Sequence, residues 1–342
     1  MNKKLKVVFY CNDTLSNITE MEYYNQDVKA LEENGCEVFI CNKFIDIPIK
    51  FDLIFIWWWT YALYPVLLAK VLNRKSIITG VFNFKSNNYI KKSGFLARPF
   101  YQRILISLAV KLVDANLFTS KIEFEDVTNF YKLKRQNHYY FPCAIGDQYF
   151  RSDKNFDGRF GLLNISWSGR ENLIRKGVFN ILDAMKILKD KGVETNCILA
   201  GKKGDGYEIL VQKCRDLGLD KSVRIIGEIS LEEKLKLFAT TKIYLQPSYF
   251  EGFGLAGAEA LASGCCVITC DVGEVKIVIG EGGYYVNPGS PNELANALEI
   301  LLKDQNIASE KIKIGQDRLL ELYSYNKKKK SIGIILKKWF SI

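Results

Sequence analysis

Short runs of apolar residues alternate with amphipathic segments along most of the chain. In the first half, apolar runs predict strands within residues 5–10, 36–41, 53–57, 76–82 and 115–120. In the second half, strands are predicted within residues 160–169, 195–201, 222–227, 242–248, 266–271 and 283–287. Helical patterns lie between them, for example at 25–35, 177–189 and 231–239. This alternation indicates βαβ units and parallel sheets.

The segment 140–159 separates the two series of elements. It mixes proline, glycine and charged residues, as a linker does. A chain of 342 residues is long enough for two domains that each bury a core. We therefore expect an α/β protein with two Rossmann-like, doubly wound parallel-sheet domains, 1–150 and 151–325, that face each other across a cleft. Ligands of such sheets bind beyond the carboxyl ends of the strands.

The charge of the chain narrows the choice of partners. The 48 Lys and Arg exceed the 38 Asp and Glu and give a formal net charge of +10. An anionic partner is therefore expected: nucleic acid, anionic lipid or a phosphorylated metabolite. No nucleic-acid-binding module is recognisable, which argues against nucleic acid. The basic and aromatic segment 85–103 instead suggests an anionic membrane surface or a lipid diphosphate; it contains Lys85, Tyr89, Lys91, Lys92, Phe95, Arg98, Phe100, Tyr101 and Arg103.

Cysteine and histidine usage argues against a zinc site. The nine cysteines form no C-x-x-C pair, and the single histidine, His138, is expected to be structural. Free thiols are typical of a reducing compartment. The apolar run at 5–10 is too short for a secretory signal. The apolar stretch 53–69 falls short of the ~20 residues that a spanning helix needs. We expect a cytoplasmic protein that is peripheral on the inner face of the membrane.

Residues 252–257 match the pattern G-x-G-x-x-G, and Asp271 follows after a helix and a strand. This is the fingerprint of a dinucleotide-binding oxidoreductase, which would use Gly252, Gly254, Gly257 and Asp271. Two features weigh against it. Five residues separate the first glycine from the strand, and the following helix, about 255–263, is short. The pattern alone is weak evidence.

The same segment can instead bind a diphosphate at the start of a helix. The first turn of a helix has unpaired N–H groups and a positive dipole end. Gly254 and Leu255 would open that helix, and glycine lets the backbone approach phosphate oxygens closely. Glu259, about one turn further on, would accept hydrogen bonds from ribose hydroxyls. Glu251 would face the part of the ligand beyond the phosphates.

These residues resemble the donor-binding region of retaining glycosyltransferases of family 4, which have the GT-B fold. The family carries two glutamates separated by seven residues, as Glu251 and Glu259 are here. It also carries Gly-Arg followed by Lys-Gly, matched by Gly169-Arg170 and Lys176-Gly177. The resemblance of pattern extends over about residues 160–305. It implies that Arg170 and Lys176 grip the diphosphate, that Glu259 binds the ribose and that Glu251 contacts the sugar; Gly169, Gly252, Phe253, Gly254 and Leu255 complete the donor site.

The chain departs from the family pattern in places. The spacing from Arg170 to Lys176 is one residue longer than usual, which leaves Arg175 as a rival to Lys176. Asn83 or Phe84 occupies the region where many members have a histidine. Lys276 and Ile277 stand where many relatives have Pro-Glu. The resemblance further implies that the terminal segment, 326–342, is a helix that packs back on the first domain.

The function expected from the sequence is sugar transfer with retention of configuration. The donor would be a nucleotide diphosphate sugar, UDP-linked first and GDP-linked second, and the acceptor a glycan or a lipid-linked glycan of surface polysaccharide synthesis. No cofactor or metal is expected, because the sequence contains no D-x-D. Three alternatives stay open: an NAD-dependent oxidoreductase, a nucleotide-sugar epimerase of similar fold, and a non-catalytic binding protein.

Overall fold

The computed structural model describes residues 4–82, 84, 94–132, 137–150 and 156–340. It divides into two compact units: unit 1, residues 1–144 and 325–342, and unit 2, residues 145–324. The sequence had predicted boundaries at 150/151 and 325/326. The chain passes between the units twice, and the two passages meet within unit 2, where Ile145 and Ser324 form a parallel bridge.

Unit 1 contains a six-stranded sheet in which all neighbouring strands are parallel. In β1, Val7 and Phe9 point into one apolar cluster while Val8 and Tyr10 point into another. This alternation follows from the two-residue period of a strand, and it gives the sheet two buried faces. In spatial order the strands are β2 (Cys36–Cys41), β1 (Leu5–Cys11), β3 (Leu53–Trp57), β4 (Lys75–Gly80), β5 (Ala115–Phe118) and β6 (His138–Tyr140).

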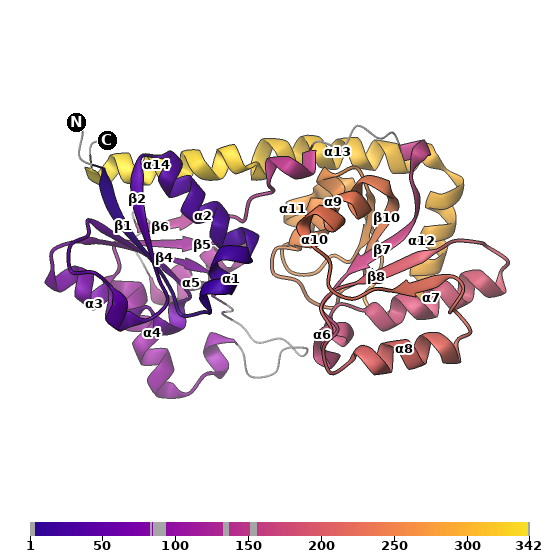
Figure 1. Ribbon diagram of the computed structural model, residues 1–342, viewed down its shortest axis with the longest axis horizontal. Coiled ribbons are helices and arrows are strands. Elements are labelled where there is room, and N and C mark those ends of the chain that lie inside the picture. The colour runs from indigo at the N-terminus through magenta and orange to yellow at the C-terminus, as the bar shows by residue number, and fades with distance from the viewer. Residues whose placement is uncertain (1–3, 83, 85–93, 133–136, 151–155, 341–342) are drawn as a thin grey trace. The chain divides into compact units, whose positions relative to one another are not determined.

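Helices cover both faces of this sheet (Figure 1). One face is packed by α2 (Glu22–Glu33) and α14 (Tyr325–Phe340), and the other by α3 (Leu63–Val71), α4 (Phe100–Leu112) and α5 (Lys121–Tyr131). The short helix α1 (Leu15–Glu20) precedes α2. The last helix of the chain, α14, therefore belongs to unit 1.

A buried ion pair holds α14 on α2. Lys328 Nζ lies 2.8 Å from a carboxylate oxygen of Asp27, and both side chains are almost fully buried. Trp57 Nε1, at the end of β3, donates to the other oxygen of Asp27 at 2.9 Å. Charge and hydrogen bonding thus fix the position of the helix in addition to its apolar packing.

Unit 2 repeats the plan with a second parallel six-stranded sheet. In spatial order its strands are β12 (Gly283–Tyr285), β11 (Cys266–Thr269), β10 (Thr241–Gln246), β7 (Phe160–Ile165), β8 (Cys197–Ala200) and β9 (Val223–Ile225). Its helices are α6 (Arg170–Arg175), α7 (Val178–Asp190), α8 (Tyr207–Asp216), α9 (Leu231–Thr240), α10 (Leu255–Ala262), α11 (Val275–Ile279), α12 (Pro291–Lys303) and α13 (Gln305–Tyr323).

The predicted fold class, α/β with two doubly wound parallel sheets, is confirmed. Strands β2 and β3 have the predicted bounds, and β3 is a run of five buried residues. The strand β6 was not predicted, since it is only three residues long and contains no aliphatic side chain. Among the described residues, no helix combines the length and the apolar character that crossing a membrane requires.

Candidate functional site

The loop 247–254 leaves the carboxyl end of β10 and is clamped by neighbouring glycines. At Gly177 (φ +65°) an added Cβ would lie 2.0 Å from the carbonyl oxygen of Pro247. At Gly273 (φ +56°) it would lie 1.8 Å from the carbonyl oxygen of Glu251. No side chain fits at either glycine, so two segments press on the loop and fix its backbone around Glu251.

The carboxylate of Glu251 is buried among positive groups. Its Oε1 accepts hydrogen bonds from Lys176 Nζ at 2.6 Å and from Ser248 Oγ at 2.7 Å. Arg175 Nη1 lies 3.8 Å from Oε2 and donates to the carbonyl of Phe250 at 3.0 Å. The residue is only 5% exposed. The two rival cations of the sequence, Arg175 and Lys176, both lie at this carboxylate.

The charge of Glu251 is stable at neutral pH. Burial by itself would raise the pKa of the carboxyl group. The charges of Lys176 and Arg175, with the hydrogen bonds from Lys176 and Ser248, outweigh burial and hold the pKa below its ordinary value. An ionised Glu251 cannot donate a proton. It can accept a hydrogen bond from a hydroxyl group or stabilise a developing positive charge.

The loop ends at the start of α10, where the residue before the helix, Gly254, has no side chain to cap it. Gly254 precedes α10 with φ +79°, and a Cβ there would meet Val275 Cγ2 at 3.0 Å and Gln246 Nε2 at 3.1 Å. The N–H of Gly257 donates to Gln246 Oε1 at 2.9 Å. The helix dipole and the first-turn N–H groups other than that of Gly257 make this end of α10 suitable for an anion.

Three residues around the start of α10, Gly252, Phe253 and Leu255, differ in how far they are buried. At Gly252 an added Cβ would meet no atom within 4 Å, so that position faces open space. Phe253 is half-buried, and its ring packs against Tyr323 at 5.4 Å between centroids. Leu255, also half-buried, begins the helix. The open side at Gly252 is where a ligand can approach the helix start.

Glu259 lies in the interior of α10 and has a cation of its own. The residue is 2% exposed, and its Oε2 lies 2.6 Å from Lys234 Nζ of α9. Lys234 also donates to the hydroxyl of Tyr149 at 3.1 Å and lies over its ring. Lys234 was not predicted as a site residue, because nothing in the sequence of α9 distinguishes it from the exposed Lys236.

The two glutamates act on a common neighbour. Burial raises the pKa of the Tyr244 phenol in β10, and the charges of Glu251 and Glu259 raise it further.

The second predicted cation, Arg170, occupies the other end of α6. Its backbone N–H donates to Asp205 Oδ1 at 2.8 Å, and its side chain is exposed. Gly169, just before it, is buried, and a Cβ there would lie 2.6 Å from the ring of Trp167. The cations that the structure pairs with Glu251 are Arg175 and Lys176, whereas Arg170 is free to meet a ligand from solvent.

The geometry fits a dinucleotide fingerprint poorly. The strand β10 ends at Gln246, so the loop segment 247–251 precedes Gly252. The helix α10 has only eight residues. Asp271 is more than half exposed and pairs with Lys276 at 3.6 Å. In the nicotinamide-binding fold the first glycine forms the tight turn between strand and helix.

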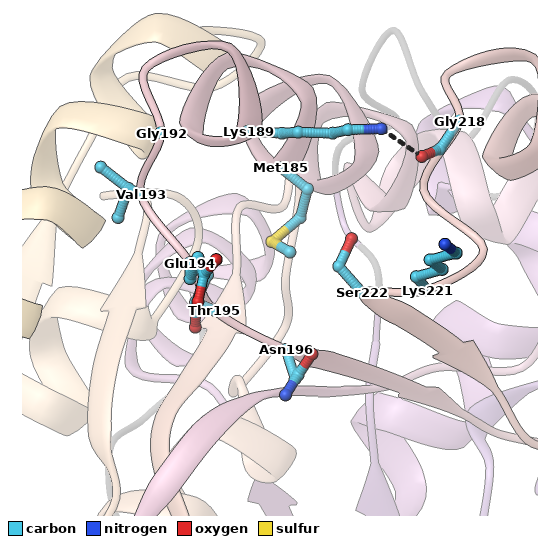
Figure 2. A pocket seen from close by; sticks show the side chains of 10 residues that line it. All are labelled: Met185, Lys189, Gly192, Val193, Glu194, Thr195, Asn196, Gly218, Lys221 and Ser222. Carbon is cyan, nitrogen blue, oxygen red and sulfur yellow. Dashed lines mark hydrogen bonds between the residues drawn. The ribbon is translucent and has the colours of Figure 1, made fainter.

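A hollow of about 570 Å³ lies elsewhere in unit 2 (Figure 2). Its lining includes the residues that precede β8 and β9, such as Asn196 and Ser222, and Lys189, which donates to the carbonyl of Gly218. These residues mark the amino ends of the strands, whereas Glu251 and the start of α10 follow a carboxyl end. The hollow contains none of the predicted site residues.

The remaining residues that the sequence analysis considered, His138 and Phe84, are buried in the core of unit 1. Within the described parts of the chain, no three His, Cys, Asp or Glu side chains are placed to hold a metal ion. His138 is buried and lies 3.1 Å from the side-chain amide nitrogen of Asn116. Phe84 is buried against Phe82 and Phe95, and Asn83 lies outside the described residues.

Part of the chain matches a known protein family, and the matched part contains most of the candidate site. Residues 170–318 match the sequence model of the family described as glycosyl transferases group 1. The matched segment contains Arg170, Lys176, Glu251 and Glu259. It covers unit 2 from α6 to α13 and none of unit 1.

Two curated relatives are glycosyltransferases. The chain is 32% identical over 152 residues to D-inositol 3-phosphate glycosyltransferase of Corynebacterium glutamicum, which covers 42% of the chain and 35% of the relative. It is 25% identical over 199 residues to the O-antigen chain mannosyltransferase RfbU of Salmonella typhimurium, which covers 58% of the chain and 54% of the relative. The chain thus spans about a third to a half of the length of these relatives.

Solved structures match over nearly the whole chain and show the fold to be GT-B. The structure of Anabaena HepE in complex with UDP matches 98% of the chain and 100% of its own, with a TM-score of 0.74 and 15% identity. Sucrose-phosphate synthase from Thermosynechococcus elongatus matches 99% of the chain and 100% of its own, with a TM-score of 0.70 and 17% identity.

Proposed function

We propose that the protein transfers a sugar, with retention of configuration, from a nucleotide diphosphate sugar to a glycan or lipid-linked acceptor. The observation that carries this proposal is the ion pair between Lys176, at the end of α6, and the buried Glu251, in the loop that precedes α10. The match of the segment 170–318 to group 1 glycosyl transferases supports it, because that segment contains Arg170, Lys176, Glu251 and Glu259.

The diphosphate of the donor would bind at the start of α10. Gly254 permits close approach of the backbone, and the first-turn N–H groups face the phosphate oxygens. Lys176 and Arg175 would add positive charge from one side and Arg170 from solvent. As the sugar–phosphate bond breaks, the leaving diphosphate gains negative charge, and preorganised cations stabilise that charge.

The two glutamates would hold the rest of the donor. Glu251, ionised and fixed by Lys176 and Ser248, would accept a hydrogen bond from a hydroxyl of the donor sugar. Glu259, paired with Lys234, would accept hydrogen bonds from the ribose. Each carboxylate is oriented by a cation, so little side-chain entropy is lost when the donor binds.

The transfer would proceed on one face of the sugar. The acceptor hydroxyl oxygen forms the new bond to the anomeric carbon while the bond from that carbon to the phosphate oxygen breaks. The acceptor proton passes to the departing diphosphate. Cations and backbone N–H groups would do the work that a divalent metal does elsewhere, so we expect activity to persist in EDTA. An activity that collapses in EDTA would refute this part of the proposal.

A thermal-shift screen with UDP, GDP, ADP, TDP and NADH tests the donor. A ligand that binds only the folded chain raises the unfolding temperature by mass action. We expect UDP to give the largest shift and GDP the next largest. A shift with NADH and none with any nucleoside diphosphate would favour an oxidoreductase. The anomeric configuration of the product, read by NMR, tests retention.

Product analysis and a variant of Glu251 test the two remaining alternatives, an epimerase and a non-catalytic binding protein. An epimerase would release UDP and free sugar from a UDP-sugar with no acceptor product. A non-catalytic binding protein would bind the nucleotide, and its Glu251→Ala variant would function in cells as the wild type does.

A further inference from the structure

The outward sides of α3 and α4 in unit 1 expose apolar side chains in rows. On α3 the residues Tyr64, Leu67 and Val71 are exposed, and their spacing of three and four positions places them on one side of the helix. On α4 the exposed residues Phe100, Ile104 and Leu108 follow at intervals of four. The exposure is large: 83% for Val71 and 71% for Phe100.

Both rows point away from the same face of the sheet. The opposite side of α3 buries Val66 and Ala69, and that of α4 buries Ile106 and Val110, all in one cluster. The two helices contact each other and lie next to each other in Figure 1. The two rows therefore form one surface, the α3/α4 face, which consists of Tyr64, Leu67, Val71, Phe100, Ile104 and Leu108.

The α3/α4 face continues onto the short 3₁₀ turn η1 (Phe44–Asp46) that follows β2. The ring of Phe44 lies 6.1 Å from that of Tyr64. Ile45, next to it, is 87% exposed. Isolated exposed apolar residues are ordinary on protein surfaces, but a contiguous group of this kind indicates a binding surface.

The charges around this surface are mainly positive. Neither Leu63–Val71 nor Phe100–Leu112 contains Asp or Glu. Lys70 and Lys111 are exposed on the two helices; Lys111 lies over the ring of Tyr131, and Lys70 is 3.8 Å from the half-buried Asp114. Exposed lysines, Lys43 and Lys50, also flank η1, which carries one exposed acid, Asp46.

We infer that the α3/α4 face binds the surface of a membrane that contains anionic lipid. Apolar and aromatic side chains enter the boundary between headgroups and acyl chains, while lysines beside them reach lipid phosphates. A second copy of the chain fits less well, because two basic, acid-free helix pairs would repel each other. The inference needs no donor, so it stands or falls independently of the proposed transfer.

The basic and aromatic segment singled out in the sequence contributes only in part. Phe100 and Tyr101 are exposed on α4, but Phe95 is buried. Lys85, Tyr89, Lys91 and Lys92 lie outside the described residues. The α3 row, which the sequence analysis did not single out, supplies the rest of the surface.

Co-sedimentation of the full chain with vesicles tests the inference. We expect binding to vesicles of equal parts phosphatidylglycerol and phosphatidylcholine, and much weaker binding to phosphatidylcholine alone. The triple variant Phe100→Ser, Ile104→Ser, Leu108→Ser removes the α4 row. Its partition coefficient should fall by at least about 100-fold, since each inserted apolar side chain contributes roughly ten-fold.

A matched control changes equally exposed apolar residues of unit 2: Ile209, Ile300 and Leu320, which are 42%, 43% and 54% exposed. Their serine variant should bind vesicles as the wild type does. Lys111→Glu, a single surface change, should lower binding to the anionic vesicles by roughly thirty-fold through its change of two charges. The inference is overturned if Lys111→Glu binds the anionic vesicles as the wild type does, or if both triple variants lose binding equally. It is also overturned if vesicle binding does not depend on phosphatidylglycerol. It is also overturned if the chain is a dimer that the α4 triple variant converts to a monomer.

Discussion

At the scale of single residues, a buried carboxylate keeps its charge because of what surrounds it. Glu251 is almost fully buried, which favours the neutral form, yet its pKa is lowered. Lys176 and Arg175 supply the compensating charge and Ser248 a hydrogen bond. A charge kept in place in this way does not need to reorganise when the reaction charge develops, which is the usual source of electrostatic catalysis.

Glu251→Gln keeps the shape of the side chain and removes its charge. We expect kcat for sugar transfer to fall by roughly 100-fold or more. The affinity for UDP should change little, because the proposal assigns Glu251 to the donor sugar, which UDP lacks. Steady-state kinetics and UDP titration measure the two effects. Glu232→Gln, which breaks an exposed pair with Lys236, should leave both unchanged. A Glu251→Gln enzyme with wild-type kcat would exclude the assigned role.

His138 makes the stability of unit 1 depend on pH. Burial lowers the pKa of His138 to about 4. Between the ordinary value near 6.5 and this value, the unfolded chain binds a proton that the folded chain does not, so stability falls as pH falls through that window. The loss should reach up to about 3 kcal/mol. Denaturant unfolding from pH 7 to pH 4 should show it in the wild type and not in His138→Gln. If the free energy of unfolding fell equally with pH in both proteins, His138 would not be the group responsible.

At the scale of elements, the start of α10 depends on a glycine that no other residue replaces without strain. Gly254→Ala puts a side chain into the left-handed region, at a cost of about 1 to 2 kcal/mol, and against Val275 and Gln246. We expect lower stability and weaker UDP binding, since the first-turn N–H groups would move. Gly192→Ala is the matched control, because Gly192 has a similar φ of +73°, its Cβ would meet nothing within 4 Å and it lies outside the candidate site. If Gly254→Ala bound UDP as tightly as Gly192→Ala, the helix start would not be the phosphate site.

The helix α14 depends on its buried ion pair. Burial raises the pKa of Asp27 against the charge of Lys328, so the pair is costly to desolvate. Lys328→Met would leave the carboxyl group without its partner and should destabilise unit 1 by about 3 to 5 kcal/mol. The next residue, Lys329, pairs with Glu33 at the surface, and Lys329→Met should have little effect. Equal unfolding midpoints for the two variants would contradict this account.

Sequence reasoning located well those elements that a local sequence pattern determines. The strand β3 is a fully buried apolar run. The helix α10 follows Gly254, with Glu251 before it and Glu259 within it. The pair of Lys234 and Glu259 could not be predicted, because it joins α9 to α10 through tertiary packing. The choice between Arg175 and Lys176 was likewise beyond the sequence, and the structure places both at Glu251.

At the scale of the whole molecule, both units resemble known proteins in fold, but only unit 2 matches a family in sequence. The family match lies within unit 2, whereas the fold match extends over 98% of the chain. The proposed donor site also lies in unit 2, so the part of the chain that the family model matches is the part to which the proposal assigns the nucleotide sugar.

The central claim is that the start of α10, together with Lys176, binds a nucleoside diphosphate. Calorimetric titration of UDP into the wild type and into Lys176→Met tests it most directly. We predict one binding site per chain in the wild type and an affinity at least about ten-fold lower in the variant, as expected when a charge-assisted contact to phosphate is lost. A wild type that binds no nucleoside diphosphate, or a Lys176→Met variant that binds UDP with unchanged affinity, would contradict the claim.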